Sequence, residues 1–588
     1  MNEILNRISR LREQMIKDKV THVYVPTDDY HLSEYVGDYF KCREYISGFT
    51  GSAGVCLITL TNAYLWTDSR YFIQAAKELE DTSVELFKMG EEGVLSPRAY
   101  LKETLKSGDT LCVDFSVIDV DFGIYLSKLA KTNNFKILNK DYFKHIWTDR
   151  PEISRKLGFS LPLSRTGVSR KNKIKSIQEQ LIKDNADYTV VASLDDIMWT
   201  LNIRGRDVMC SPVMLSYLVI GRDNVTFYSF EESLTNKMKA DLSKDGVEHK
   251  SYFEIYDDIA NINKKIVVVD KNRVNYAIYT KLQEHNEIIF RDNYSLMMKA
   301  IKNNIEIRNM KKAHIKDGVA MVKFLHYVKT TSDEMSELSL GDKLIEFRSE
   351  HDTFIEPSFE SIVGFKEHGA IVHYSASNES NVKIGSDTFL LVDSGGQYLE
   401  GTTDITRTIA LGKVTREMKK HFTLVLKGHL ALYDVKFLKG TSGASLDVLV
   451  RKPLWDNGLN YGHGTGHGIG CLLNCHEGPN SISFNRVGVS FVPGMITSNE
   501  PGLYIEDAYG IRHENLMLCT KVKNAKQPFY RFEQLTYVPF DLNGIDKTLL
   551  TVKEKEILNK YHARVYKKIS PYLNEKERKW LKQQTRAI

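Results

Sequence analysis

A short pattern that occurs twice in the first third of the chain constrains the fold more than any other feature. Residues 12–18 read Arg-Glu-Gln-Met-Ile-Lys-Asp and lead into the apolar run 23–25. Residues 178–184 read Gln-Glu-Gln-Leu-Ile-Lys-Asp and lead, in the same register, into the apolar run 189–191. The spacing of apolar residues predicts an amphipathic helix followed by a buried strand. Because this unit is repeated once, we predict two related α/β domains in tandem.

The chain has 588 residues, enough for three or four domains at about 150 residues each. The loose polar stretch at residues 149–170, with Pro151 and Pro162, predicts the first linker. The pattern changes after residue 303, where residues 306–329 place apolar side chains three and four positions apart and predict a long helix with a core-facing stripe. We therefore predict an α/β (α+β) chain with domains at residues 1–155, 156–303 and 304–588, the last with a C-terminal extension.

Several classes of protein are excluded by the composition. No apolar run approaches the roughly 18 residues that a membrane-spanning helix needs. Residues 1–19 form a charged, amphipathic segment without the features of a signal peptide. The cysteines are seven in number and scattered, which fits a reducing compartment better than a disulfide framework. We therefore expect a cytoplasmic protein.

The net charge of +5 is concentrated at the C-terminus. Residues 551–588 contain 11 Lys and Arg against 4 Glu, so this tail carries +7 and the rest of the chain −2. The tail lacks the alternation of basic and aromatic residues that is typical of nucleic-acid binding. We expect no nucleic-acid partner, and a tail that either keeps a helix solvated or covers a subunit contact.

Two aspartates fall in a predicted hairpin in the last half of the chain. The apolar run 389–392 ends in Asp393, glycines follow, and a second β-like run begins after Asp404. This pattern predicts two carboxylates on neighbouring strands. A carboxylate that closes an apolar strand is costly to bury unless a metal or another cation lies beside it.

Residues 462–470 (Gly-His-Gly-Thr-Gly-His-Gly-Ile-Gly) carry two histidines among glycines. They lack the Gly-Lys-Ser/Thr of a phosphate loop, and no dinucleotide fingerprint is present. In an extended conformation His463, Thr465 and His467 share one face, and the glycines allow a neighbouring backbone or ligand to approach closely. The pattern favours metal-ligand and acid–base roles for His463 and His467.

His476 follows in a tight turn, close to Cys471 and Cys475. Because no second cysteine pair completes a structural zinc site, we interpret both thiols as packing residues.

Glu500 precedes a Pro-Gly turn, and Arg512 and Glu514 share one face of a predicted strand. Arg512 can therefore orient that carboxylate without touching the metal itself. His513 points to the opposite face and is expected to be structural.

The candidate metal ligands are Asp393, Asp404, His467, Glu500 and Glu514. Four of the five are carboxylates, which suits two hard or borderline divalent ions such as Mn²⁺. Two ions roughly 3.5–4 Å apart can hold a hydroxide and polarise a carbonyl together, so we predict metal-assisted hydrolysis. A Ser-His-Asp mechanism has no support, because no Gly-x-Ser-x-Gly elbow occurs.

In order and spacing these segments resemble the pita-bread metallopeptidases, and most of all the three-domain, cytosolic-type aminopeptidases P (Xaa-Pro aminopeptidases). The matching segments are residues 370–374, 393–398, 401–408, 462–470, 476–479, 498–502 and 510–515, with 48–54, 66–72 and 201–205 outside the catalytic part. The resemblance implies two tandem creatinase-like N-terminal domains, a pita-bread catalytic domain and a homodimer.

By this resemblance, the five candidate ligands hold two divalent ions, with Asp404 and Glu514 shared between them. His373, His463 and His476 would line the substrate site, hold the scissile carbonyl and stabilise the tetrahedral intermediate. Glu500 would also handle the proton of a hydroxide that bridges the ions and attacks the carbonyl before a proline. The implied substrates are peptides with proline second, whose scissile tertiary amide has no N–H. Mn²⁺ is expected first, and Zn²⁺ or Co²⁺ would accept the same ligands.

Two alternatives remain at this stage. A prolidase, which cleaves Xaa-Pro dipeptides, uses the same set of ligands, although two complete N-terminal domains argue against it. A metal-free pita-bread scaffold that binds peptides or histones would be expected to have lost ligands, whereas all five positions hold ligating residue types. His513 is the one departure near the ligands, since the family often has an aliphatic residue there.

Overall fold

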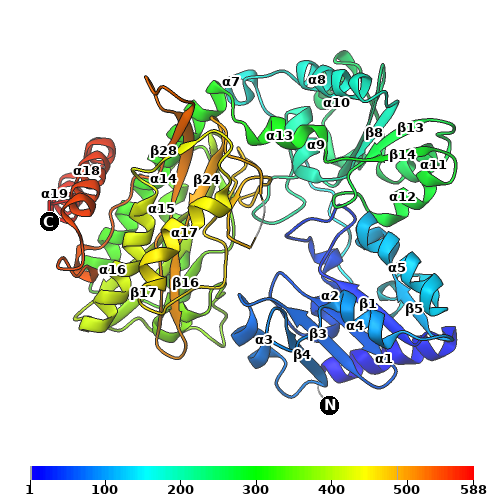
Figure 1. Ribbon diagram of the computed structural model, residues 1–588, viewed down its shortest axis with the longest axis horizontal. Coiled ribbons are helices and arrows are strands. Elements are labelled where there is room, and N and C mark those ends of the chain that lie inside the picture. Colours follow the sequence, from blue (N-terminus) through cyan, green and yellow to red (C-terminus); the bar gives the residue numbers. More distant parts are fainter. Residues whose placement is uncertain (1–2, 486–487) are drawn as a thin grey trace. The chain divides into compact units, whose positions relative to one another are not determined.

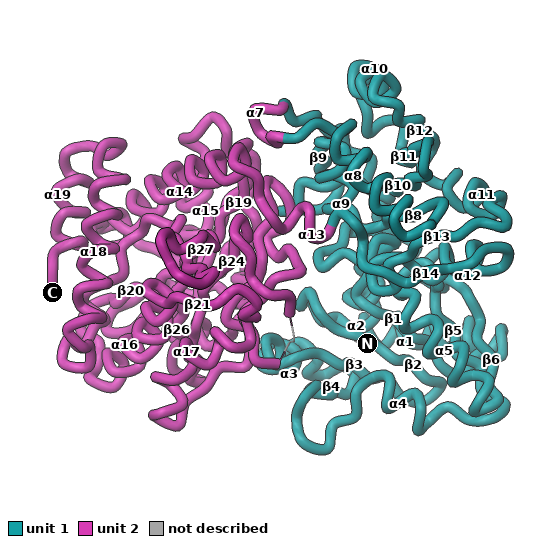
Figure 2. The backbone as a smooth tube through the Cα atoms, turned by 45° about the horizontal axis from the view of Figure 1, so that its top comes forward, with its two compact units in different colours: residues 1–162, 168–295 teal, residues 163–167, 296–588 magenta. Residues whose placement is uncertain are grey.

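The computed structural model describes residues 3–485 and 488–588. Packing divides the chain into two compact units, shown in different colours in Figure 2. Unit 1 contains residues 1–162 and 168–295, and unit 2 contains residues 163–167 and 296–588. Each unit is described by itself below.

The first half of unit 1 is a mixed sheet with the strand order β4-β3-β2-β1-β5-β6 (Figure 1). Its strands are β1 (His22–Pro26), β2 (Val55–Thr59), β3 (Ala63–Thr67), β4 (Val84–Lys88), β5 (Thr110–Val113) and β6 (Lys136–Asn139). Helix α1 (Glu3–Asp18) buries Ile4, Ile8, Leu11 and Met15, which lie three and four positions apart on one face. These side chains pack into the apolar core beneath β1 and β2.

The second half of unit 1 repeats this sheet, with the order β12-β11-β10-β8-β13-β14. Its strands are β8 (Tyr188–Val191), β10 (Ser216–Gly221), β11 (Val225–Ser229), β12 (Val247–Ser251), β13 (Ile266–Val269) and β14 (Glu287–Phe290). Helix α8 (Arg170–Lys183) precedes β8 as α1 precedes β1. β1 and β8 each pair antiparallel with the next sheet strand in sequence and parallel with a later one. The duplication that the repeated pattern predicted is therefore confirmed.

Unit 2 is organised around a long helix, α14 (Asn304–Thr330), which matches the helix predicted at residues 306–329. The side chain of Asn303 accepts hydrogen bonds from the backbone N–H groups of the first turn, and the side chain of Glu306 accepts one from the backbone N–H of Asn303. This reciprocal capping fixes where the helix starts. Three further helices run beside the strands of this unit in Figure 1. They are α15 (Glu337–Ser349), α16 (Arg416–Ala431) and α17 (Gly443–Trp455).

The strands of unit 2 form small sheets. One has the order β16-β17-β20 and another the order β21-β28-β27-β24. The bounds are β16 (Ile362–Phe365), β17 (Thr388–Ser394), β20 (Ile405–Leu411), β21 (Lys436–Leu438), β24 (Ile496–Asn499), β27 (Asn515–Lys521) and β28 (Phe529–Gln534). Val319 of α14, Phe389 of β17 and Phe422 of α16 belong to one apolar core, so the helices fix the strands that carry the candidate site.

The basic tail is part of this core. It forms α18 (Val552–Ile569) and α19 (Glu575–Gln584). Leu558, Val565 and Leu581 are buried against the helices and strands of unit 2, while most of the charged side chains remain in solvent. One face of the tail is therefore solvated, as the first of the two expectations for the tail predicted. The other face forms part of the core.

The domain boundaries predicted at 155/156 and 303/304 stay a prediction, since the contacts keep both sheets in one unit. Within the predicted linker, the short helix α7 (Leu163–Thr166) belongs to unit 2. The side-chain amides of Asn303 and Asn309 donate to the carbonyls of Thr166 and Ser164, which ties α7 to α14. Among the described residues, no helix combines the length and the apolar character that crossing a membrane requires.

Candidate metal centre

The two aspartates lie on or beside neighbouring antiparallel strands of unit 2, as the sequence predicted, but the strands are not joined by a simple turn, because β18 (Gly396–Tyr398) and β19 (Gly401–Thr402) lie between them and belong to another sheet. β17 and β20 pair antiparallel along their lengths, with Asp393 opposite Thr406. Asp404 immediately precedes β20. Both carboxylates are buried, at 7% and 3% exposure, and Asp404 lies close enough to raise the pKa of Asp393.

His467 lies on the short strand β22 (Gly466–His467), which pairs with β23 (Ser481–Ile482). A side chain at Gly466 would overlap the carbonyl of Ser498, so glycine is what lets β22 lie directly against β24. The imidazole Nε2 is 3.4 Å from Oδ2 of Asp404 and 3.2 Å from Oε1 of Glu500.

Glu514 completes the group from the junction between β26 (Tyr509–Arg512) and β27. One ligand atom from each of Asp404, His467 and Glu514 lies within 4.8 Å of the other two. Glu514 is 1% exposed, and its Oε2 accepts a hydrogen bond from the Thr406 hydroxyl at 2.7 Å.

Arg512, which the sequence predicted to orient Glu514, binds Asp393 instead, because β26 ends at Arg512 and strand alternation does not continue to Glu514. Its Nε and Nη2 donate to Oδ2 of Asp393 at 3.1 and 2.6 Å. Among the described residues, the remaining oxygens, Oδ1 of Asp393 and Oε1 of Glu514, are buried without a hydrogen-bond partner. A buried carboxylate oxygen without a partner is costly, and a bound cation would satisfy both oxygens.

The pKa shifts of these side chains also indicate that a cation would stabilise the group. Burial raises the pKa of Asp393, and the neighbouring Asp404 adds to the rise although Arg512 opposes it. Burial together with Asp404, Asp393 and Glu500 places the pKa of Glu514 well above its usual range. Burial lowers the pKa of His467, but hydrogen bonds to Asp404 and Glu500 outweigh burial and raise it. The site therefore demands positive charge, which divalent metal ions on oxygen ligands would supply.

The other predicted histidines have different neighbours. Nε2 of His463 is 2.8 Å from the Tyr504 hydroxyl, and burial lowers the pKa of His463 to about 4, so its ring is neutral near pH 7. The ring of His476 meets that of His467 edge to face at 4.2 Å between centroids. His373 follows the short helix η5 (Lys366–Ala370), which packs on β26 through close contact of Gly369 with Gly510.

The extended segment predicted at residues 462–470 is shorter in the structure, because only Gly466 and His467 pair as a strand. His463 lies in a loop. The hydroxyl of Thr465 donates to Oδ1 of Asp447 in α17, so a contact from a helix, and not strand alternation, sets the direction of this side chain.

Two further residues adjoin the ligands, one in sequence and one in space. His513 faces away from the carboxylates and packs on Phe422 and Phe540, with ring centroids 4.3 and 5.4 Å away. Cys475, interpreted from the sequence as a packing residue, has its sulfur 3.2 Å from Oδ2 of Asp404. Its thiol is therefore a neighbour of a candidate metal ligand. The sequence carried no signal for this contact, because the two residues are 71 positions apart.

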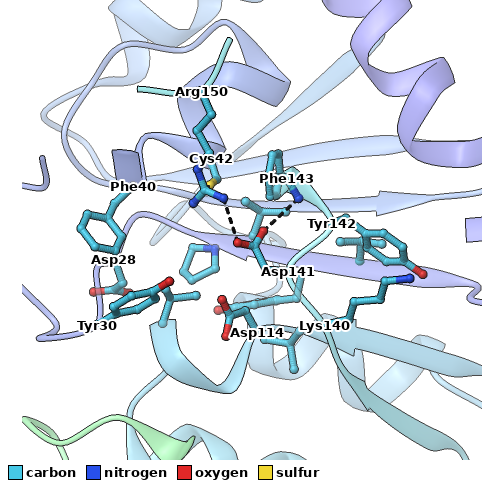
Figure 3. Close-up of a pocket in the computed structure, with 16 residues that line it drawn as sticks. Asp28, Tyr30, Phe40, Cys42, Asp114, Lys140, Asp141, Tyr142, Phe143 and Arg150 are labelled. Carbon is cyan, nitrogen blue, oxygen red and sulfur yellow. Dashed lines mark hydrogen bonds and ion pairs between the residues drawn. The ribbon is translucent and has the colours of Figure 1, made fainter. Parts of the chain in front are cut away.

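A separate cavity lies in unit 1, at the carboxyl ends of β1, β5 and β6 (Figure 3). Tyr30, Asp114 and Asp141 line it, and Arg150 donates to Asp141 at 2.8 Å. None of the predicted catalytic or metal-binding residues is among its described lining residues.

Comparison with known proteins places these features in a family. Residues 308–521 match the metallopeptidase family M24, and residues 528–588 match the C-terminal region of that peptidase. Residues 7–140 and 149–306 each match the creatinase/prolidase N-terminal domain. Aminopeptidase P1 of Lotus japonicus is 33% identical, with 99% of each chain covered. The chain belongs to metallopeptidase family M24. The predicted family and architecture are confirmed.

Other M24 relatives cover the whole chain as well. Xaa-Pro aminopeptidase 1 of Dictyostelium discoideum is 36% identical over 100% of this chain and 97% of its own. The crystal structure of the X-prolyl aminopeptidase of Caenorhabditis elegans, described as a cytosolic enzyme with a di-nuclear active site, superposes with a TM-score of 0.96 at 32% identity over 100% of both chains. The Xaa-Pro dipeptidase of Bacillus anthracis covers only 64% of this chain, at 23% identity and a TM-score of 0.52.

Proposed function

We propose that this protein is a metal-dependent aminopeptidase that removes the N-terminal residue from peptides with proline in the second position. The observation that carries the proposal is the group formed by Asp404, His467 and Glu514. It lies in the catalytic domain of a chain that matches Xaa-Pro aminopeptidases from end to end.

We assign the metal ligands to Asp393, Asp404, His467, Glu500 and Glu514, with Asp404 and Glu514 shared between two ions. The unpartnered oxygens of Asp393 and Glu514 support this assignment. Divalent ions bound there would lower the pKa of water and polarise the scissile carbonyl. Arg512 orients Asp393 through its two hydrogen bonds and opposes the rise of its pKa.

The proton and the substrate are handled by side chains of this chain. Burial raises the pKa of Glu500, but the bonds to His467 outweigh burial and lower it, so Glu500 is ionised. We assign the proton of the attacking water to Glu500, as the family resemblance implies. His463 is neutral, and its Nε2 accepts from the Tyr504 hydroxyl, which fixes the ring for contact with substrate. We assign His373 and His476 to the same substrate site, where imidazole N–H groups can hold the carbonyl oxygen as charge develops.

Proline in the second position removes the N–H from the scissile amide. A site that holds the carbonyl oxygen with imidazole donors does not need that N–H and can therefore accept this bond. The prolidase alternative is disfavoured by the two complete N-terminal domains, since the B. anthracis dipeptidase matches 64% of the chain. Assay of an Xaa-Pro-Xaa tripeptide against an Xaa-Pro dipeptide tests this point, and cleavage of the dipeptide alone would reject the proposal.

We propose Mn²⁺ as the native metal, because four of the five assigned ligands are carboxylates. The test is hydrolysis of a proline-second peptide by untreated, chelated and metal-reloaded protein, with Mn²⁺, Co²⁺ and Zn²⁺ compared at equal free concentration. We expect loss of activity on chelation and the largest recovery with Mn²⁺. Asp393→Ala should bind less metal and lose hydrolysis. Unchanged hydrolysis in that variant would reject both the metal mechanism and the ligand assignment.

We also propose a cytoplasmic homodimer, as the family resemblance implies. Support comes from four exposed apolar side chains on and beside α17, namely Val448, Leu449, Trp455 and Phe484. Light scattering should give about twice the chain mass of 67.4 kDa, and the mass of a single chain would reject the dimer.

A further inference from the structure

A buried ion cluster lies in unit 2 beside the His476 turn. Its members are Glu477, Lys299 and Lys302, which are 3%, 1% and 4% exposed. Nζ of Lys302 is 2.6 Å from Oε1 of Glu477, and Nζ of Lys299 is 3.6 Å from Oε2. Taking such charges out of water is costly, and a well-packed apolar cluster would avoid that cost. Stability alone therefore does not explain why these three residues are charged.

The two lysines are fixed by the backbone at the junction of two helices. Lys299 lies near the end of α13 (Tyr294–Ala300), and Lys302 precedes α14. Nζ of Lys302 also donates to the carbonyl of Lys299 at 2.9 Å, and its backbone N–H donates to the carbonyl of Gly494 at 3.0 Å. The ammonium groups therefore form an anchored cationic pair with one carboxylate between them.

Glu477 is the chain neighbour of His476, in the loop that joins β22 to β23. Its backbone N–H donates to the carbonyl of Gly468 at 2.8 Å, and the N–H of Gly468 donates to the carbonyl of Asn480 at 2.9 Å. The loop is thus bonded directly to the residue that follows His467. A displacement of Glu477 would move both His476 and the backbone beside His467.

We propose that Glu477 is a positioning residue, held by Lys299 and Lys302, that fixes the His476 turn against His467. The inference rests on the proposed function, in which His476 contacts the substrate. The carboxylate of Glu477 is engaged by the lysines, so it acts through the turn and not on the substrate. Neutralising Glu477 removes the carboxylate that both ammonium groups contact and releases the turn from α13 and α14.

The test is Glu477→Gln, which keeps the shape of the side chain and removes its charge. We expect kcat for a proline-second tripeptide to fall on the order of 10- to 100-fold, because small misplacements of a reacting group have effects of this size. KM and metal content should stay at the wild-type values. The matched control is Glu533→Gln, which removes a carboxylate from a half-exposed pair with Lys311 on α14 and should leave kcat unchanged.

A triple variant, Lys299→Met/Lys302→Met/Glu477→Gln, separates positioning from stability. It removes the two ammonium groups together with the carboxylate they contact, so its Tm should return towards the wild-type value, whereas kcat should stay low because the contacts that hold the turn are absent. Recovery of kcat together with Tm, or a wild-type kcat in Glu477→Gln, would overturn the inference.

Hydrogen exchange of the Glu477 amide tests the inference without any assay of activity. The amide should exchange faster in Glu477→Gln than in the wild type or in Glu533→Gln, and equal rates would overturn the proposal. If the wild type fails to cleave proline-second peptides, the proposed function is wrong, and the exchange rates still decide whether Glu477 fixes the turn.

Discussion

Replacing Arg407 by lysine should destabilise unit 2 strongly, although the substitution keeps the positive charge. Arg407 lies in β20, three residues after Asp404, and is 1% exposed. Its guanidinium joins the strands of the metal centre to α18. It donates to the carbonyls of Pro539 (3.1 Å), Thr406 (2.7 Å), Glu514 (2.6 Å) and Val538 (2.7 Å), to Oδ1 of Asn515 (2.8 Å) and to the Tyr561 hydroxyl (3.1 Å).

The size of the effect follows from these six acceptors. A lysine ammonium has three donors on one nitrogen and cannot reproduce the fork of the guanidinium, so three acceptors lose a donor. Two of them can be the carbonyls of Val538 and Thr406, which also accept from the Tyr561 hydroxyl at 2.7 Å and from the backbone N–H of Glu514 at 3.2 Å. One acceptor then remains buried and unpaired at about 1–3 kcal/mol, and each of the other two loses a bond worth about 0.5–1.5 kcal/mol. We take about 3 kcal/mol as the expected loss.

The assay is differential scanning calorimetry of the metal-loaded protein. Unit 2 contains about 300 residues, and unfolding entropy of about 2.1 cal/mol/K per residue gives roughly 0.6 kcal/mol/K, so about 3 kcal/mol should lower its Tm by about 5 °C. Arg531→Lys is the control, because Arg531 lies exposed on β28. A shift below about 1 °C for Arg407→Lys, close to that of the control, would refute the view that these acceptors depend on the guanidinium.

Three further predictions test other parts of unit 2. Glu514→Gln should raise the Tm of the metal-free protein at pH 7, since it removes one of several buried, mutually repelling carboxylates. The variant should also lose the rise in Tm that the wild type shows on adding Mn²⁺. An unchanged metal-free Tm would contradict this reasoning. Burial lowers the pKa of His562 to about 3, so the unfolded chain takes up a proton near pH 6.5 that the folded protein refuses, and stability is lost as pH falls from about 6.5 towards 3. Between pH 6 and 4, the free energy of unfolding of His562→Gln, measured with urea, should depend on pH less steeply than that of the wild type, by about 1.4 kcal/mol per pH unit. An equal dependence on pH would count against a neutral buried imidazole. Gly468→Ala places a methyl group on the carbonyl oxygen of Glu477, so the free energy of unfolding should fall by about 1–3 kcal/mol and Mn²⁺ should bind more weakly in calorimetric titration. Wild-type affinity would show that the loop can move aside without disturbing the ligands.

Local patterns in the sequence were sufficient for the fold of unit 1. A helix and a buried strand depend on the spacing of apolar residues over one or two turns, so the repeated segments identified α1 with β1 and α8 with β8. The carboxylates at the ends of apolar runs were informative for the same reason. An Asp or Glu that follows a buried strand is exceptional enough to indicate chemistry without knowledge of its partner.

The partners themselves could not be predicted, because they come from distant parts of the chain. Lys302 meets Glu477 across 175 positions, and Cys475 meets Asp404 across 71. In each case the residue types are ordinary at the level of sequence. Only packing of the β22–β23 loop against the segment before α14, and against the start of β20, brings each pair within hydrogen-bond distance.

Thr465 shows why alternation along a strand was an incomplete guide to the site. The rule that side chains at positions 463, 465 and 467 share a face holds only while the backbone is extended, and here pairing covers Gly466 and His467 alone. A buried carboxylate, Asp447, binds Thr465, and the same carboxylate accepts from Arg451, which in turn donates to the carbonyl of His463. The backbone at His463 is therefore held through α17. An Asp447 variant should disturb residues 462–465 before it disturbs Asp404 and Glu514, because these two carboxylates receive their support from β20 and β27.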